Sequence, residues 1–464
     1  MNSPGKAETA GEWSGSNPPD TPDLVRQFKP VYAWFVVALL MVAYTFSFLD
    51  RQILALLVGD IKAHLQISDT QIGLLQGLAF TLFYTTLGIP IARLADNSNR
   101  RNLIVAGITV WSVMTVSCGY ARNFLTLFLA RMGVGVGEAA LSPAAYSIIT
   151  DYFPRHHLSK ALSVYTMGVY IGGGIAFTVG GHLVAKLSEM DFSNMPVLAS
   201  LQGWQLAFIA AGLPGLLVAA AIFRFVREPA RTTSARQTLS GEHVPLRKAI
   251  SYLKENRKAY MPIYLGYSLQ AIAILGTFAW LPTQLIREFG WSVAQAGQSV
   301  GVSIFIFGCM GVLTGGAMCD RMLKSGRFDA PLILGVMGSL GMCLVFVGAY
   351  YFDVSVETKA FIYGTAFFFM GLVAGPAPAS IALIAPHRLR AQLSAVFLFS
   401  INFLGMTLGP LLPAILSDNF PDVVTSIGMA LMIIVVASTL TSIAVFLMYR
   451  RHYRQVCSQV QDGI

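Results

Sequence analysis

Two acidic and two basic residues lie inside runs of sequence that are otherwise apolar. Asp50 and Arg51 are adjacent in "TFSFLDRQILALL", and Arg131 and Glu138 fall in "ARMGVGVGEAAL". If these runs cross a membrane, each charge costs about 2.5 to 3.5 kcal/mol at the bilayer centre unless it is paired or borders water. The four charges sum to zero, which is the balance expected of paired groups.

The spacing of these residues suggests how they act. Seven residues separate Arg131 from Glu138, so on a helix both face the same way, about 10 Å apart along the axis. We expect the helices to be neighbours, with acids and arginines paired. Asp50 or Glu138 would take up the proton, while Arg51 or Arg131 would bind an anionic group of a substrate. The alternative is an ion-pair network that only fixes helix packing, although apolar residues would do so without the desolvation cost.

The elements that carry these charges are predicted membrane helices. The 464 residues are 55% hydrophobic and 12% charged, which excludes an ordinary soluble domain. Apolar runs of about 20 residues recur, and they are continuous rather than alternating, which favours helices over a barrel. We therefore expect an all-α protein with twelve spans near 32–57, 70–92, 102–120, 124–150, 159–185, 204–226, 259–286, 293–318, 330–352, 359–385, 392–416 and 425–449.

The net charge of +9 is explained by topology and not by nucleic-acid binding. Most of the 32 Lys and Arg residues fall in the segments that share a side with the two termini. The positive-inside rule then places both termini in the cytoplasm, with attraction to anionic lipid as a side effect. Residues 1–30 lack the apolar core of a signal peptide and read as a disordered tail.

The chain divides into two similar halves. A hydrophilic linker, 227–258, separates six spans in 31–226 from six in 259–450, and 451–464 reads as a second cytoplasmic tail. The linker forms either a helix on the membrane surface or a basic segment without fixed structure. "ARLADNSNRRNLIVAGI" after the second span resembles "GAMCDRMLKSGRFDAPLILG" after the eighth. Such a duplication implies a pseudo-two-fold axis, a central cavity and alternating access by rocking.

These two turns resemble the cytoplasmic signature of the major facilitator superfamily. Ala92, Asn97 and Asn99 depart from its usual Gly, Arg and Gly, while the second copy retains Gly316 and Gly326. The resemblance, with the hydrogen-bonding capacity of an Asp at a helix end, predicts a cytoplasmic gate formed by Asp96, Arg100, Arg101, Asp320 and Arg321.

Small residues are concentrated in two of the spans, in "GVYIGGGIAFTVGG" and "GMTLGP". They allow close backbone approach and bending, and a glycine-rich fifth helix is frequent among exporters of the superfamily. We expect helix flexing at Gly172, Gly173, Gly174, Gly405, Gly409 and Pro410.

The predicted spans of the second half contain no internal Asp, Glu, Lys or Arg and are rich in phenylalanine, as in "SIFIFG", "FFFMG" and "FLFSINFLG". One wall of the cavity is thus expected to be charged and the other apolar. An amphiphile fits this asymmetry, with its head on Arg131 and its tail against the second half.

Within the superfamily, the first half is similar to the spinster branch. The similarity rests on "FLDRQ", "GLLQGLAF" and "ARMGVGVGEAALSPAAYSIITDYF". It implies proton-dependent transport of lysophospholipids or sphingosine 1-phosphate, and the acids and arginines of the branch fall on the four charges above. Ser47 and Phe48 replace the usual Asn and Tyr, so the headgroup preference does not carry over.

Together these patterns predict a proton-coupled secondary transporter of a lysolipid-like substrate, a monomer in the bacterial inner membrane. We expect it to use the proton gradient and no cofactor or metal, and to bind no nucleic acid. The alternatives are an organic-anion/proton symporter or a drug/proton antiporter. A membrane-embedded lipid enzyme or a receptor is a further alternative, but the sequence lacks HExxH, GxSxG and a His cluster.

Overall fold

The computed structural model describes residues 30–190, 200–229, 246–386 and 389–462, and within these ranges the chain is helical and contains no strand. The first half consists of α1 Pro30–Gln52, the 3₁₀ turn η1 Ile53–Leu56, α2 Val58–Leu65, α3 Asp69–Gln76, α4 Leu78–Asn97, α5 Arg100–Cys118, α6 Phe124–Glu138, α7 Leu141–Tyr152, α8 Arg155–Thr166, α9 Gly168–Glu189 and α10 Gly203–Phe225. The second half consists of α12 Leu246–Glu255, α13 Arg257–Met261, the π-helical turn η2 Pro262–Gly266, α14 Tyr267–Phe289, α15 Val293–Ser303, the π-helical turn η3 Ile304–Gly308, α16 Cys309–Lys324, α17 Ala330–Tyr351, α18 Val356–Ala374, α19 Pro376–Ile384, α20 Arg390–Asn419 and α21 Ile427–Asp462.

Eleven helical segments of the described chain are long and apolar enough to cross a membrane, and each matches one of the predicted spans. The remaining predicted span, 70–92, forms α3 and α4 but is not among the eleven. It carries Gln71, Gln76 and several threonines, and its helix is interrupted at Gly77. The all-α membrane fold is confirmed, while the count of twelve spans stays a prediction.

The predicted tails and linker are only partly described. Most of 1–30 lies outside the described residues, since α1 begins at Pro30. In the linker, α12 agrees with the helical alternative, and its Tyr252 and Leu253 pack against the core of the second half. The last helix, α21, continues to Asp462 through most of the predicted tail, because Tyr453 and Cys457 are buried.

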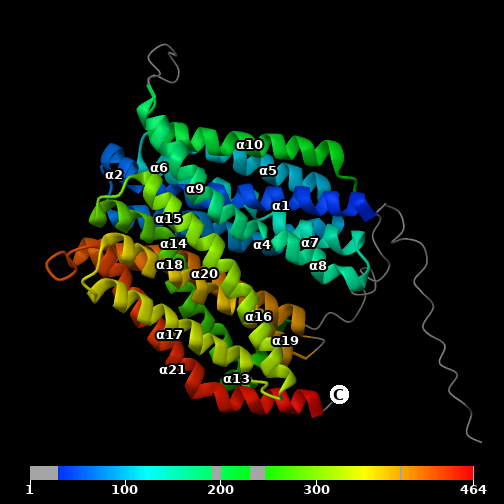
Figure 1. Cartoon of the computed structure of the whole chain (residues 1–464). Helices are drawn as coiled ribbons and strands as arrows, with labels where there is room; N and C mark the ends of the chain where they lie inside the picture. Colours follow the sequence, from blue (N-terminus) through cyan, green and yellow to red (C-terminus); the bar gives the residue numbers. More distant parts are fainter. Residues whose placement is uncertain (1–29, 191–199, 230–245, 387–388, 463–464) are drawn as a thin grey trace, which may run out of the picture.

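The helices form two bundles that lie side by side (Figure 1). Helices α1 to α10, coloured blue to green, make one bundle, and α13 to α21, coloured green to red, make the other. The start of α1 and the end of α21 lie at the same end of the molecule, as an even number of crossings requires. We call this the inner end, because the sequence predicts it to be cytoplasmic, and the opposite end the outer end.

Two helix pairs join the bundles: α9 packs on α15, and α3 and α4 pack on α20. In order of spans these are the fifth with the eighth, and the second with the eleventh. Adding six to the fifth gives the eleventh and subtracting six from the eighth gives the second, so exchanging the halves turns one pair into the other, as a two-fold relation requires. The packing therefore agrees with the repeat seen in the sequence.

Backbone meets backbone at both junctions. A Cβ added to Gly301 of α15 would lie 2.6 Å from the Gly174 carbonyl oxygen of α9, and one on Gly181 would lie 3.3 Å from the Cα of Gly297. On the other side, a Cβ on Gly77 would lie 2.6 Å from the Met406 carbonyl oxygen. Only glycine permits such close approach.

The apolar core is shared at the outer end and divided at the inner end. One buried cluster contains Leu54 and Ile61 of the first bundle together with Trp280 and Leu285 of the second. Towards the inner end, the buried residues separate into one cluster centred on the first bundle and another within the second. The two bundles therefore share apolar packing at the outer end and pack separately at the inner end.

Candidate functional site

The site begins where α1 ends. Arg51 and Glu138 form an ion pair with a distance of 2.5 Å between Arg51 Nη2 and Glu138 Oε2, and Ser47 Oγ donates to the same oxygen at 2.7 Å. The Glu138 side chain is fully buried, whereas that of Arg51 is 13% exposed. The guanidinium lies over the rings of Phe80 and Tyr84, at 4.3 and 5.1 Å from their centroids. Both the carboxylate and the aromatic faces thus stabilise the Arg51 charge.

Glycines of α6 bring Glu138 to this position. A Cβ on Gly135 would meet the Phe80 carbonyl oxygen of α4, and a Cβ on Gly137 would lie 2.5 Å from the Trp111 nitrogen of α5. The "GVGVGE" sequence therefore lets α6 approach both neighbours, and the helix ends at Glu138 in the middle of its span.

Asp50 and Arg131 form a second, deeper group. The Asp50 carboxylate accepts from Thr115 Oγ1 at 3.3 Å, and Arg131 Nη1 donates to the main-chain carbonyl of Asp50 at 3.1 Å. Both residues are at most 1% exposed. Asp50 Oδ1 and Arg131 Nε and Nη2 have no hydrogen-bond partner among the described residues, and the same holds for Glu138 Oε1 and Arg51 Nε. Buried atoms of this kind are what internal water or a bound ligand satisfies.

The expected neighbourhood of the two helices is therefore observed, with one difference. Arg51 and Glu138 pair through their side chains, but Arg131 holds the backbone of Asp50 instead of its carboxylate. The sequence predicts that a substrate headgroup binds Arg131. Arg131 is fully buried and does not line the cavity, whereas Arg51 does.

A cavity of about 60 Å³ lies between the bundles beside Arg51. The first bundle contributes a mixed wall of Phe48, Arg51, Gln52, Ala55, Gln76 and Phe80. The second contributes an apolar wall of Leu275, Phe278, Ala279, Met406 and Pro410. The asymmetry expected from the sequence is thus present in the cavity lining.

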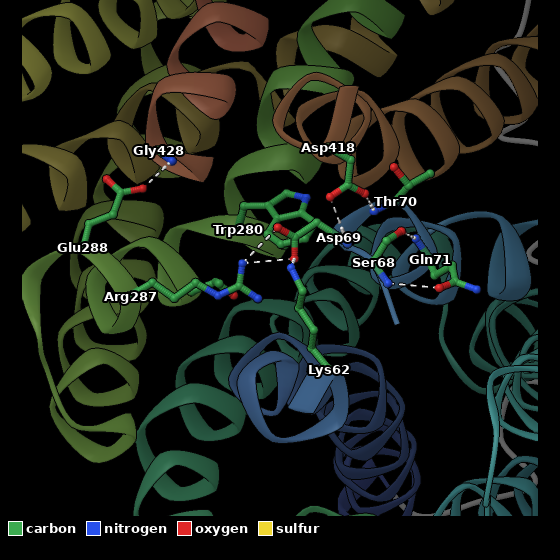
Figure 2. A network of polar contacts seen from close by, with 12 residues as sticks. Lys62, Ser68, Asp69, Thr70, Gln71, Trp280, Arg287, Glu288, Asp418 and Gly428 are labelled. Carbon is green, nitrogen blue, oxygen red and sulfur yellow. Dashed lines mark hydrogen bonds and ion pairs between the residues drawn. The ribbon is translucent and has the colours of Figure 1, made fainter. Parts of the chain in front are cut away.

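At the outer end, charged residues close the junction between the bundles (Figure 2). Arg287 of α14 and Lys62 of α2 both contact the Asp69 carboxylate, at 3.0 Å and 2.9 Å. Asp418 of α20 accepts from the backbone nitrogens of Asp69 and Thr70, at 3.3 and 2.6 Å. A carboxylate at the start of α3 also meets the positive end of the helix dipole. We call Lys62, Asp69, Arg287 and Asp418 the outer latch.

The outer latch was not predicted from the sequence. Its members are charged residues at the ends of spans, and such residues are common wherever a helix meets water. Lys62 and Arg287 are unusual only as basic residues on the side that the positive-inside rule leaves poor in them.

The predicted gate residues lie at the inner end, and Arg100 and Arg101 have partners within their own bundle. Arg100 is buried and bonds Asp151 at 2.5 Å and Glu228 at 2.7 Å, two acids that the sequence did not single out. Arg101 is partly exposed, with its guanidinium 5.0 Å from the Phe223 ring centroid. Asp320 and Arg321 are exposed on α16, and the side chain of Asp96 lies outside the described residues. Their role as a gate stays a prediction.

The residues predicted to allow flexing lie at close helix contacts. Gly172 and Gly173 face Thr45 and Phe48 of α1, and Gly174 faces α15. In α20, a Cβ on Gly405 would lie 2.7 Å from Ala271 Cβ, and one on Gly409 would lie 2.8 Å from the Gly276 nitrogen. Pro410 lines the cavity, and its carbonyl accepts from Trp280 Nε1 at 2.7 Å.

Three comparisons with known proteins are informative. The family model described as Major Facilitator Superfamily matches residues 40–410. The chain is 27% identical over 433 residues to an MFS-type efflux pump of Mycolicibacterium smegmatis, covering 92% of this chain and 94% of the pump. It is 26% identical to the sphingosine-1-phosphate transporter SPNS2 of Mus musculus, covering 89% of this chain and 75% of that protein. A solved bacterial homolog of the human lysosomal transporter spinster, inward-facing and unoccupied, aligns with a TM-score of 0.75 at 27% identity, covering 93% of this chain and 98% of its own.

Proposed function

The chain belongs to the Major Facilitator Superfamily, and from that premise we propose that it is a proton-coupled secondary transporter of a lysolipid-like substrate with an anionic or zwitterionic headgroup. Membership and the spinster-like similarity make it a multi-pass membrane transporter and not an enzyme. The bacterial relatives fit the predicted inner-membrane location. Substrate class and proton coupling are the proposed part.

One observation carries the proposal: the cavity has a cation on one wall and an apolar surface on the other. Arg51 is the charged residue of its lining, and the residues facing it from the second bundle are apolar. A phosphate-bearing headgroup binds a guanidinium through charge-assisted hydrogen bonds. An acyl chain gains about 0.8 kcal/mol for each CH₂ group that it buries against the apolar wall.

Glu138 links this binding to a proton. When its carboxylate is charged, it holds Arg51 at 2.5 Å and competes with a substrate anion. When it is protonated, the pair loses its attraction, while Arg51 keeps its charge because a guanidinium does not deprotonate in proteins. Arg51 then binds the headgroup, so substrate affinity rises as the pH falls. Asp50 is the second candidate for the proton, and Arg131 offsets the carboxylate charges from within the protein.

Alternating access would proceed by rocking of the two bundles. The outer latch and the shared core hold the outer end together, and the divided core leaves the inner end apart. In the other half of the cycle the latch parts and the inner gate residues meet across the bundles. A single chain forms the whole cavity, so a monomer suffices, and the proton gradient supplies the free energy without a cofactor.

The test is reconstitution in vesicles with an imposed pH gradient. A fluorescent lysophospholipid that albumin extracts from the outer leaflet reports substrate movement, and a trapped pH-sensitive dye reports protons. We expect both to move together, and Glu138→Gln to abolish the pH dependence. A coupling of 1 to 3 kcal/mol corresponds to an effect of about 5- to 150-fold.

The control is Glu357→Gln, which removes an exposed acid of α18 far from the cavity and leaves the pH dependence unchanged. If Asp50→Asn and Glu138→Gln both transport with normal rate and unchanged pH dependence, the coupling mechanism is wrong.

Efflux of a drug-like amphiphile is a second candidate, favoured by the similarity to the M. smegmatis efflux pump. A cationic dye such as ethidium, added to the same vesicles, separates the two. Arg51 repels a cation, so the lysolipid proposal expects no dye transport and no competition. Dye movement that resists excess lysolipid would favour the second candidate.

A further inference from the structure

Two glutamines line the cavity beside Arg51, and one of them has an unused acceptor. Gln76 is the last residue of α3, directly before the helix break at Gly77. Its Nε2 donates to the Ala279 carbonyl of α14 at 3.4 Å, but its Oε1 is enclosed and lacks a donor. Leaving an enclosed acceptor unsatisfied is unfavourable, so this oxygen is suited to a donor that enters the cavity.

Arg51 adds an unused donor to the same lining. Its Nε is buried without a partner, while Nη2 is held by Glu138. The cavity therefore offers a cationic donor and a neutral acceptor together. A headgroup with a phosphate and an adjacent hydroxyl satisfies both, because the phosphate accepts from Arg51 and the hydroxyl donates to Gln76.

A hydroxyl suits Gln76 better than an ammonium group. The amide oxygen carries no net charge, and Arg51 in the same lining repels a second cation. In a lysophospholipid, a free hydroxyl stands on the glycerol next to the phosphate-bearing carbon, at the position from which an acyl chain is missing. It is the group that distinguishes a lysolipid from its diacyl parent.

We propose that Gln76 is a specificity-determining residue that recognises the free glycerol hydroxyl of the lysolipid while Arg51 binds the phosphate. This inference rests on the proposed function and names the group that the site selects. Substrate binding would then be coupled to closure of the outer end, because the Gln76 side chain that binds the hydroxyl also donates to the Ala279 carbonyl of the opposite bundle.

Two lipids that differ by one oxygen test the inference. The purified full chain in nanodiscs is titrated with 1-oleoyl lysophosphatidate and with 1-oleoyl-propanediol 3-phosphate, which lacks the hydroxyl. We expect the first lipid to bind about tenfold more tightly, as one hydrogen bond to an enclosed acceptor supplies. In Gln76→Leu the ratio of the two Kd values is expected to fall to about one.

Gln298→Leu is the control. Gln298 is exposed on α15 and is not part of the cavity lining, so the wild-type ratio should persist. Gln76→Glu keeps an acceptor oxygen at the same place and is expected to retain the preference for the hydroxyl. It therefore tests the inference even if Gln76→Leu folds poorly, which thermal unfolding of each variant reports.

The failures of the two ideas look different. If the wild type binds both lipids with equal affinity, or if Gln76→Leu retains the tenfold ratio, the role of Gln76 is refuted while the proposed function stands. If the wild type binds neither lipid, the proposed function fails, and the inference fails with it.

Discussion

The two bundles share a fold but use different chemistry in their interiors. The first bundle buries Asp50, Arg131 and Glu138 within its spans. Within the spans of the second bundle, neutral groups make the buried polar contacts: Gln270 donates to the Gly335 carbonyl at 3.2 Å and to Ser339 Oγ at 3.1 Å. The second bundle's buried charged residue in the described chain, Asp329, lies at the inner end and pairs with Arg450.

The neutral network has a structural task. Ser339 Oγ donates to Ser442 Oγ, which donates to the carbonyl of Gly266, the last residue of the π-helical turn η2. A π-helical turn leaves a carbonyl without its usual helical partner, and Ser442 supplies a donor. The comparison teaches that the two halves share a scaffold, while buried charge lies within the spans of the first half and a neutral network stabilises a helix irregularity in the second.

The largest expected effect comes from removing one member of the buried ion pair. Glu138→Ala leaves Arg51 without its counter-charge, and breaking such a pair costs about 3 to 5 kcal/mol. Thermal and denaturant unfolding in detergent should show this loss.

The matched variant is the double substitution Arg51→Leu with Glu138→Leu, which removes both charges. It should recover most of the stability, since an apolar replacement of a buried pair is often neutral, but it should not bind lysolipid. A double variant as unstable as Glu138→Ala would mean that the pair is needed to fold the first bundle.

A smaller effect is expected from the neutral network of the second bundle. Gln270→Leu leaves the Gly335 carbonyl and the Ser339 hydroxyl without this donor, which costs about 1 to 3 kcal/mol. The melting temperature should fall, but the pH dependence of transport should match the wild type. If Gln270→Leu changes the pH dependence, the division of tasks between the bundles is wrong.

The contrast between a charged and a neutral bundle does not extend to the outer latch, because both bundles contribute charged residues there. Asp418→Ala removes the acceptor of two backbone nitrogens of α3. We expect this to shift the equilibrium towards the open form of the outer end by about 1 to 2 kcal/mol, which raises the ratio of open to closed molecules about 5- to 30-fold. Spin labels at Gly59→Cys and Glu357→Cys, in a background without the native cysteines, report the distance across the outer end.

The smallest effect is expected from Lys62→Ala in the same assay. The Lys62 side chain is 36% exposed, and ion pairs of this kind contribute about 0 to 1 kcal/mol. Asp69 also keeps Arg287. If Lys62→Ala changes the spin-label distance as much as Asp418→Ala does, then Lys62, and not the contact of Asp418 with the start of α3, contributes most to the stability of the outer latch.

The sequence was most informative where a residue type is energetically unfavourable in its surroundings, as a charge is within an apolar membrane helix. Asp50, Arg51, Arg131 and Glu138 stand out because charge is rare in apolar helices, and the structure brings them together as expected. It could not reveal that Arg131 binds a main-chain carbonyl, since every residue carries one. Nor could it reveal that Gln76 reaches the cavity, because a glutamine near the end of a span is unremarkable.

The outer latch shows a second limit. Asp69 is 218 residues from Arg287 and 349 from Asp418, and nothing in their local sequence specifies a contact. The pairing follows from the way α3 packs on α20, which itself packs on α14, and this depends on the arrangement of both bundles. By contrast, the two-half organisation and the small residues of α9 and α20 were visible as patterns, because periodicity and composition record them directly.

The glycine contact between α9 and α15 has a consequence for the speed of transport. Side chains that interlock across a moving interface must withdraw from one set of hollows and enter another, and that exchange raises a barrier. Where Gly301 meets the backbone of Gly174, there is little to withdraw. In the proposed rocking motion the two helices pivot at this contact, so we expect the barrier to turnover to lie in separating the charged groups and hydrating the core at the two ends.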